Sequence, residues 1–153
     1  MLFYIFAVLA AAVDQGSKLW IRAHMEVGAS TPVWDSVLHF THYENSGMAH
    51  SLFQGYGRLF ALFAVLFIAG VLYYRKKGEL KGRLIDISMG FLVGGAAGNA
   101  IDRILFGKVT DFLEFTWSHG IMNLADVAIN IGVLLFIAST IAGVVKSKIT
   151  DAA

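Results

Sequence analysis

Four windows of the chain are long and apolar enough to cross a lipid bilayer. A transmembrane helix needs about 20 mostly apolar residues, because each residue adds only about 1.5 Å to its length. The windows are too uniformly apolar for the strands of a membrane β-barrel, which alternate polar and apolar residues over about 10 positions. The sequence therefore predicts an all-α membrane protein with four transmembrane helices, at about residues 2–21, 57–74, 84–101 and 124–145.

The composition agrees with this fold class and argues against several others. Of the 153 residues, 57% are hydrophobic and 15% are charged, whereas a soluble domain has about 25% charged residues. The net charge of +1 provides no basic surface for a polyanion, so we expect no nucleic-acid partner. The chain has no cysteine, which excludes disulfides and thiol nucleophiles. The length suits one integral membrane domain over residues 1–153.

The first window has an alternative interpretation as a cleavable secretory signal. Residues 2–12 are apolar, and the three alanines at 10–12 resemble a cleavage site. However, no Lys or Arg precedes the window, and the helical pattern continues through Asp14 and Lys18 into Leu19-Trp20-Ile21. We therefore interpret this window as the first membrane helix.

The basic residues predict the orientation of the chain. Seven Lys or Arg residues lie in the link between the second and third windows and in the C-terminal tail, against four in the other two links. Because short cytoplasmic loops carry the excess of basic residues, both termini are expected in the cytoplasm. Segments 22–56 and 102–123 then lie on the outer side. The seven are Arg75, Lys76, Lys77, Lys81, Arg83, Lys146 and Lys148, and the four are Arg22, Arg58, Arg103 and Lys108.

The two outer segments contain candidate strands. Residues 33–43 and 109–117 are rich in β-branched and aromatic residues, which favours short strands or extended arms. Their apolar content predicts a small sheet on the membrane surface. In the third window, Gly90, Gly94 and Gly98 recur at a spacing of four, which permits close packing of helices in lipid.

Several ionisable residues lie within or beside the apolar windows, where a charge costs about 2.5–3.5 kcal/mol or more. Asp14 and Lys18 are four apart and can pair along one helix face, and with Gln15 they can fasten the helix to an outer loop. At the end of the third window, Asn99 shares a helix face with Asp102 and with Arg103. A simple pair between Asp102 and Arg103 at the membrane interface is the structural alternative.

Two further acids carry the functional hypothesis. Asn123, Asp126 and Asn130 form one stripe at the start of the fourth window, and Asp111 has apolar neighbours in the outer segment before it. Two carboxylates held close in a poorly solvated site cannot both ionise easily, so one proton is shared and the pair can activate a water. The sequence alone does not establish that Asp111 and Asp126 meet.

We expect no metal and no cofactor. His39 and His42 are three apart in a strand-like stretch, so their side chains point to opposite faces. His24, His50 and His119 show no ligand spacing, and no His-Glu-x-x-His motif is present. The glycine-rich stretch at 94–98 lacks the Lys-Ser/Thr of a phosphate-binding loop.

Five short motifs occur in order along the chain. They are Asp14-Gln15-x-Ser17-Lys18, Asn45-x-Gly47-x-Ala49, Gly94-Gly95-Ala96-x-Gly98-Asn99-x-x-Asp102-Arg103, Val109-x-Asp111-Phe112 and Asn123-x-Ala125-Asp126. Each is weak alone, but together, on a four-helix chain of this length, they resemble the bacterial lipoprotein (prolipoprotein) signal peptidases, the signal peptidase II family of aspartic endopeptidases.

The resemblance implies an intramembrane endopeptidase of the bacterial cytoplasmic (inner) membrane. Its substrates would be prolipoproteins that carry diacylglycerol on a cysteine, and it would cut just before that cysteine, near the outer face. The implied fold has four transmembrane helices, a small extracytoplasmic sheet and an outer arm, and we expect a monomer. The resemblance assigns catalysis to Asp111 and Asp126, the substrate site to Asn45, Asn99, Arg103 and Asn123, and structural support to Asp14 and Lys18, to which we add Asp102.

The chain departs from the family pattern at His50, where an aromatic residue is usual, and at Met122, where a phenylalanine is usual. Two other functions stay open at this point. A proton-coupled transporter would use the buried acids as a relay and would be expected to show internal repeats or broken helices, neither of which is evident. A non-catalytic assembly factor would use the polar residues only to join helices.

Overall fold

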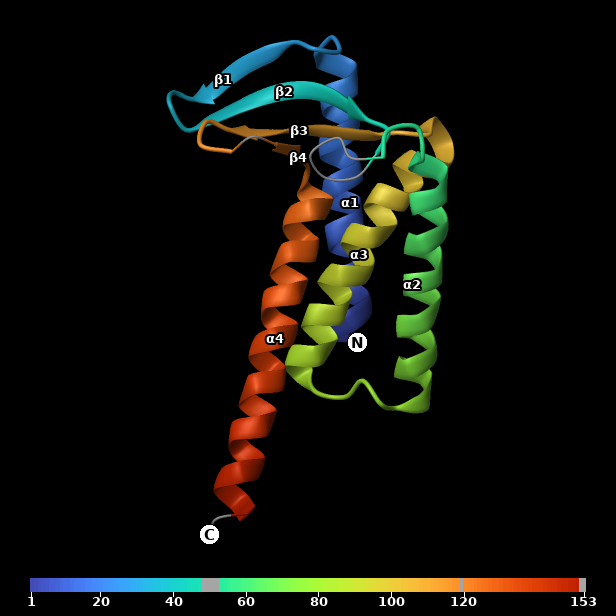
Figure 1. Ribbon diagram of the computed structural model, residues 1–153, viewed down its shortest axis with the longest axis vertical. Helices are drawn as coiled ribbons and strands as arrows, with labels where there is room; N and C mark the ends of the chain where they lie inside the picture. The colour runs from blue at the N-terminus through green and yellow to red at the C-terminus, as the bar shows by residue number, and fades with distance from the viewer. Residues whose placement is uncertain (48–52, 119, 152–153) are drawn as a thin grey trace.

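Four long helices stand side by side, and a small sheet lies across one end of them in the computed structural model (Figure 1). The structure describes residues 1–47, 53–118 and 120–151. The helices and strands, in chain order, are α1 (Leu2–His24), β1 (Ser30–Trp34), β2 (Leu38–Asn45), α2 (Gly57–Lys77), α3 (Arg83–Phe106), β3 (Val109–Phe115), β4 (Ile121–Met122) and α4 (Leu124–Asp151).

The four apolar windows all form helices that are long and apolar enough to span a membrane, as predicted. Each helix continues beyond the predicted C-terminal boundary. The helices α2 and α3 end at Gly78 and Gly107, whose φ angles of 76° and 74° lie in the left-handed region that favours glycine. The extension of α3 to Phe106 places Asp102 and Arg103 inside the helix and not in the outer link.

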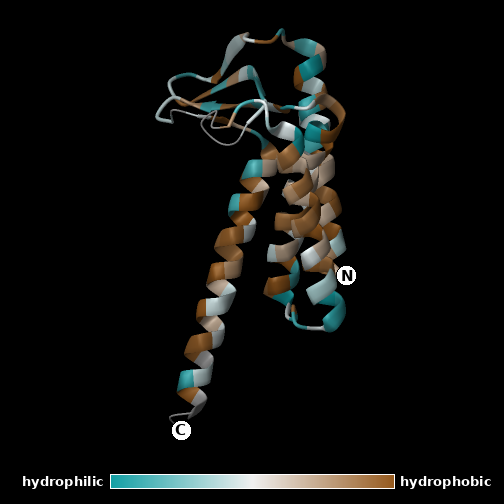
Figure 2. Ribbon diagram, turned by 45° about the vertical axis from the view of Figure 1, so that its right-hand side comes forward, coloured by the Kyte–Doolittle hydropathy of each residue, from teal (hydrophilic) through white to brown (hydrophobic). Residues whose placement is uncertain are grey.

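Helix α3 is the centre of the bundle, because it packs against the other three helices. Its glycines allow this. A Cβ added at Gly94 would lie 2.5 Å from the Ala7 carbonyl oxygen of α1, and one added at Gly95 would lie 2.5 Å from the Ala125 carbonyl oxygen of α4. The predicted close packing is therefore confirmed. Large apolar side chains on the outer faces of α1, α2 and α4 are exposed, as a lipid-facing surface requires (Figure 2).

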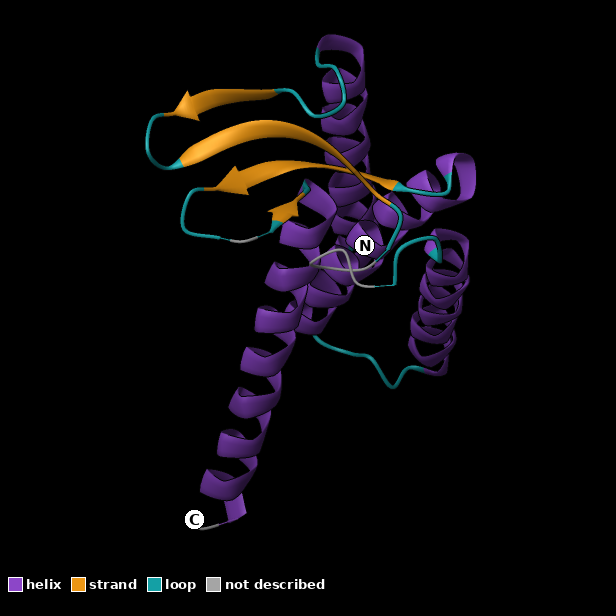
Figure 3. Ribbon diagram, turned by 45° about the horizontal axis from the view of Figure 1, so that its top comes forward, coloured by secondary structure: helices purple, strands orange, loops and turns teal. Residues whose placement is uncertain are grey.

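The sheet is antiparallel, with the strand order β1-β2-β3-β4 (Figure 3). The predicted extended stretch at 33–43 is divided into two strands by a turn, in which Ser36 has a φ of 63°. The predicted stretch at 109–117 forms β3, whereas the two-residue strand β4 was not predicted. Phe112 and Leu113 of β3 pack on Ile21, so the sheet rests on the last turns of α1.

Both termini and the link between α2 and α3 lie at the end of the bundle away from the sheet (Figure 1). This is the topology expected for four crossings that return the chain to the side where it started. The assignment of that side to the cytoplasm stays a prediction.

Candidate active site

A cavity of about 320 Å³ lies where the sheet meets the ends of α3 and α4. All six residues that were predicted to act in catalysis or substrate binding line it, although they come from four separate elements and the residue before α4. Asn130, which completes the predicted stripe on α4, lines it as well. The six are Asn45, Asn99, Arg103, Asp111, Asn123 and Asp126.

Strand β3 aims Asp111 into this cavity. Successive side chains of a strand point to opposite faces, so Thr110 meets Arg22 of α1 while Asp111 meets Asn45 and Asn123 on the other side. Strand β2 carries one extra residue between its pairings with Leu113 and Asp111. Such a bulge locally bends and twists a sheet, and bulges are common beside active sites.

Asp111 is almost fully buried, with 2% of its surface exposed. Each of its carboxylate oxygens accepts a hydrogen bond from an amide side chain. Asn123 Nδ2 donates to Oδ1 at 2.6 Å, and Asn45 Nδ2 donates to Oδ2 at 3.0 Å. Both oxygens of this acid therefore have fixed partners.

Asp126 is held by the capping of α4. Asn123 stands just before the helix, its Oδ1 accepts the Asp126 backbone N–H at 3.0 Å, and its own N–H donates to Asp126 Oδ2 at 3.2 Å. This reciprocal arrangement is a capping box. Asn99 of α3 donates to the other carboxylate oxygen at 2.8 Å. Asn123 thus contacts both acids and ties them to one another.

The electrostatic surroundings favour a shared proton. The pKa of Asp111 is raised to about 6, first by burial and second by the negative charge of Asp126, while the hydrogen bonds from Asn45 and Asn123 oppose the rise. Two carboxylates that disfavour each other's ionisation retain one proton closer to neutral pH than isolated acids do. The pair can therefore supply one acid and one base.

Arg103 lines this cavity and holds one buried donor without a partner in the described part of the chain. Its Nη2 donates to the Gly47 carbonyl at 3.1 Å, and its guanidinium lies 5.8 Å from the ring centroid of Phe60. Its buried Nε has no hydrogen-bond partner among the described residues. A guanidinium held in this way can donate to a carbonyl oxygen or to a carboxylate of a ligand.

The predicted ion pair between Asp14 and Lys18 is present at 2.8 Å, and both side chains are fully buried. The expectation that this region fastens α1 to an outer loop is wrong, because the partners are helices. Gln15 Nε2 donates to the Gly98 carbonyl of α3 at 3.0 Å, and the Ala125 N–H of α4 donates to Asp14 at 2.8 Å. Small residues at these positions let the helices approach closely enough for such contacts.

The alternative pair between Asp102 and Arg103 does not form. Asp102 instead faces α1, where it lies 3.4 Å from Lys18 and 2.7 Å from Arg22. The predicted i,i+4 pair of Asn99 and Arg103 lines the cavity, whereas Asp102 points toward α1, and Asn99 and Asp102 share a contact with Lys18 as their i,i+3 spacing allows. Asp102 therefore belongs to the buried ion cluster and does not line the cavity.

Sequence reasoning missed some residues around the site. Arg22 was counted only among the basic residues of the links and was given no role at the site. Its spacing of four from Lys18 nevertheless places it on the helix face of Asp14 and Lys18. Thr110 lies in no pattern that would have marked it as part of the site.

Met122, one departure from the family pattern, lines the cavity, whereas Ala49, His50 and His119 lie outside the described residues. Within the described ranges, no group of three or more His, Asp or Glu side chains could hold a metal.

Comparison with known proteins supports the resemblance drawn from the five motifs. A family model described as signal peptidase (SPase) II matches residues 6–142. A solved structure of a bacterial membrane enzyme at 2.3 Å resolution is similar, with a TM-score of 0.85, 29% identity, and coverage of 92% of this chain and 87% of that one. A second bacterial membrane enzyme, at 1.9 Å, has a TM-score of 0.81, 29% identity, and coverage of 90% and 91%.

Proposed function

Because the chain belongs to the signal peptidase II family, we propose that Asp111 and Asp126 are the catalytic pair with which it cleaves prolipoproteins just before their diacylglyceryl-modified cysteine. The chain is a multi-pass membrane protein and an aspartic peptidase, a hydrolase whose family removes lipoprotein signal peptides. The observation that carries the proposal is the convergence of the two acids on one cavity, where Asn123 hydrogen-bonds to both.

In the proposed reaction, one acid is ionised and the other is protonated. The ionised carboxylate takes a proton from a water held between the two, and the water attacks the scissile carbonyl. The protonated acid stabilises the oxygen that becomes negatively charged and then supplies a proton to the leaving amine. The proton belongs to the coupled pair, so the two roles are not divided between Asp111 and Asp126 here.

The remaining cavity residues would bind the extended substrate backbone. The unpartnered Arg103 Nε can donate to a peptide carbonyl, and the asparagine amides can do the same when a substrate enters. Fixing the scissile carbonyl between two carboxylates is a positioning effect of the kind that contributes strongly to enzymatic rates. The acyl chains of the substrate would stay in the bilayer and reach the cavity sideways between helices.

We further propose that the chain lies in the bacterial inner membrane as a monomer, with both termini in the cytoplasm and the cavity near the outer face. The excess of basic residues in the α2–α3 link and the C-terminal tail supports this orientation. The sheet and the cavity lie at the opposite end of the bundle (Figure 1).

The test compares Asp111→Asn and Asp126→Asn with Glu114→Gln. Glu114 lies on the same strand as Asp111, accepts a hydrogen bond from Thr41 and does not line the cavity, so it controls for the loss of a carboxylate from β3. Each purified variant is incubated with a lipidated precursor, and the new N-terminus is identified by mass spectrometry. We expect the control to release a product that begins with the lipidated cysteine, and the two Asp variants to leave the precursor uncut. Processing by either Asp variant at the control's rate would contradict the proposal.

A further inference from the structure

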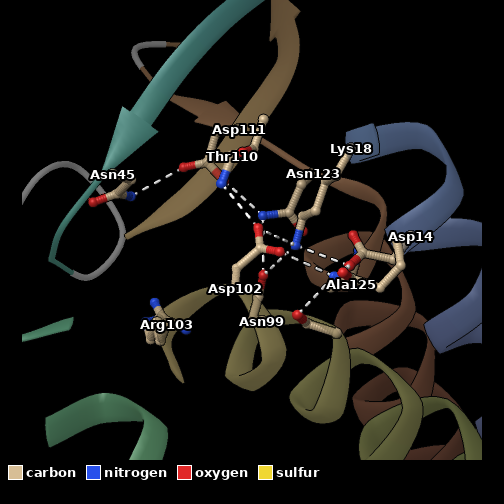
Figure 4. A network of polar contacts seen from close by, with 12 residues as sticks. Asp14, Lys18, Asn45, Asn99, Asp102, Arg103, Thr110, Asp111, Asn123 and Ala125 are labelled. Atoms are coloured by element: carbon tan, nitrogen blue, oxygen red, sulfur yellow. Dashed lines mark hydrogen bonds and ion pairs between the residues drawn. The ribbon is translucent and has the colours of Figure 1, made fainter. Parts of the chain in front are cut away.

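Each of the two proposed catalytic acids directly follows a residue whose backbone amide is held by a buried carboxylate. The Thr110 N–H, just before Asp111, donates to Asp102 Oδ2 at 3.0 Å. The Ala125 N–H, just before Asp126, donates to Asp14 Oδ1 at 2.8 Å. Figure 4 shows the two contacts on either side of the lysine that separates the two carboxylates.

Lys18 joins these two carboxylates. Its Nζ lies 2.8 Å from Asp14 Oδ2 and 3.4 Å from Asp102 Oδ2. The same ammonium donates to Asn99 Oδ1 at 2.9 Å, and Asn99 in turn donates to Asp126. One buried cation therefore connects α1 to the backbone before Asp111, to the backbone before Asp126 and to a side chain that contacts Asp126.

Arg22 completes the cluster at its outer edge. Its Nη2 donates to Asp102 Oδ1 at 2.7 Å, and its Nε donates to the Thr110 hydroxyl at 2.8 Å. The cluster of Asp14, Lys18, Asp102 and Arg22, here named the amide clamp, thus holds two acids and two bases. Burying charges is costly unless they are paired and hydrogen-bonded, and every member of the clamp meets that condition.

None of the four clamp residues lines the cavity, so the clamp is not placed to touch a substrate. Its contacts instead fix the main chain on the N-terminal side of each acid. Small errors in the position of a reacting group are costly, because a displacement of about 1 Å can lower a rate about 100-fold. Holding both amides from a single cluster is a direct way to keep the distance between two carboxylates constant.

We propose that the amide clamp sets the separation and orientation of Asp111 and Asp126, with Lys18 as its central positioning residue. The inference rests on the proposed function, because it assumes that these two acids perform the chemistry. The competing explanation is that the cluster only joins α1 to α3 and α4 and so stabilises the fold.

The chain offers a matched control for that competing explanation. Arg75 of α2 and Asp86 of α3 form an ion pair between two helices, with a second contact of 3.3 Å from Nη2 to Oδ2. Neither residue lines the cavity, and Asp86 lies near the start of α3, four turns from Asp102. Asp86→Ala therefore removes an interhelical ion pair without touching the backbone before either acid.

The experiment compares Asp102→Ala with Asp102→Asn, and Asp14→Ala with Asp14→Asn, using kcat and KM per folded, monodisperse molecule. Both substitutions remove the charge, but asparagine keeps an oxygen that can accept the backbone amide. We expect kcat to fall about 100-fold in the alanine variants with KM little changed. The asparagine variants should recover about 10-fold of that loss, and Asp86→Ala should lower only thermal stability.

The pH profile of kcat gives a readout that a purely structural role would not move. The charged groups that act electrostatically on Asp111 are Asp126 of α4 and Lys18 of α1, and both acids act on Arg103 of α3. The proposed reaction needs one of the two acids protonated, and their mutual repulsion helps to retain that proton. If the acids move apart, the repulsion weakens and the proton is lost at lower pH, so the alkaline limb of the profile should move to lower pH. The asparagine variants carry the same change of charge, so a larger shift in the alanine variants reports the lost amide contact.

Equal kcat and equal pH profiles in the alanine and asparagine variants, per folded molecule, would overturn the clamp. If the alanine variants do not fold, Arg22→Leu replaces them, because Arg22 is the most exposed member at 21%. That variant should then lower kcat and leave KM unchanged, and wild-type kcat would count against the clamp. Full activity of Asp111→Asn would instead refute the proposed catalytic pair, so the two failures are distinguishable.

Discussion

At the scale of single residues, the side chain of Asn123 makes three hydrogen bonds that organise the site. Its Nδ2 donates to Asp111 and to Asn99, and its Oδ1 caps α4 through the Asp126 N–H. An asparagine is the residue type for this position, because it can donate to one acid while it accepts from the backbone of the other. An aspartate here would lack the donor, and a serine would lack the reach.

The raised pKa of Asp111 predicts a pH-dependent stability difference for Asp111→Asn. The folded protein binds this proton more tightly than the unfolded chain, so the contribution of Asp111 to wild-type stability is lost as pH rises from 3.8 to about 6. The side chain of the asparagine variant does not titrate, so the variant does not lose this stability as pH rises. Its melting temperature relative to wild type should therefore rise across that window, by an amount equivalent to at most about 3 kcal/mol. Thermal unfolding in detergent at several pH values measures this, and a difference independent of pH would contradict it.

At the scale of elements, the site depends on how closely the helices approach α3. Asp14 reaches the Ala125 amide of α4 past Gly98, where an added Cβ would lie 2.5 Å from the Asp14 carboxylate. Any separation of α1, α3 and α4 would lengthen the contacts that hold the two acids. The glycines of α3 therefore support the candidate active site through packing.

Gly94→Ala should destabilise the protein, because its Cβ would collide with the Ala7 carbonyl of α1 at 2.5 Å. The backbone at that point cannot move without separating the helices, and overpacking of this kind costs about 1–3 kcal/mol. Gly70→Ala on α2 is the control, since nothing lies within 4 Å of a Cβ there. We expect a lower melting temperature in detergent for Gly94→Ala only. An equal effect of the two substitutions would contradict the packing argument.

The elements differ in how well the sequence predicts them. Long apolar windows depend only on composition, so the four helices were predicted, whereas their ends depend on single residues such as Gly78 and Gly107. The turn between β1 and β2 depends on the left-handed Ser36, and β4 has only two residues, too few for a pattern.

For the site, the motifs selected the cavity residues, but the partner of Asp102 depends on which side of α3 meets α1, and that is set by tertiary packing. The backbone amides before Asp111 and Asp126 have no sequence signal at all.

At the scale of the whole molecule, the absence of cysteine makes the proposed orientation directly testable. Thr31→Cys on β1 and Glu79→Cys in the α2–α3 link each introduce a single thiol at an exposed position, at opposite ends of the bundle. A membrane-impermeant maleimide should label the first in intact cells with a permeable outer membrane, and the second only after the inner membrane is opened. The reverse pattern would contradict the orientation.

The proposed function requires Asp111 and Asp126 to act together on one scissile bond. Its most direct test is an experimental structure with a lipidated peptide in which a hydroxyl-bearing carbon replaces the scissile carbonyl. We expect both carboxylates to lie within hydrogen-bonding reach, about 2.6–3.2 Å, of the oxygen on that carbon. A bound peptide that places this oxygen beside only one of the two acids, with the other beyond hydrogen-bonding reach, would contradict it.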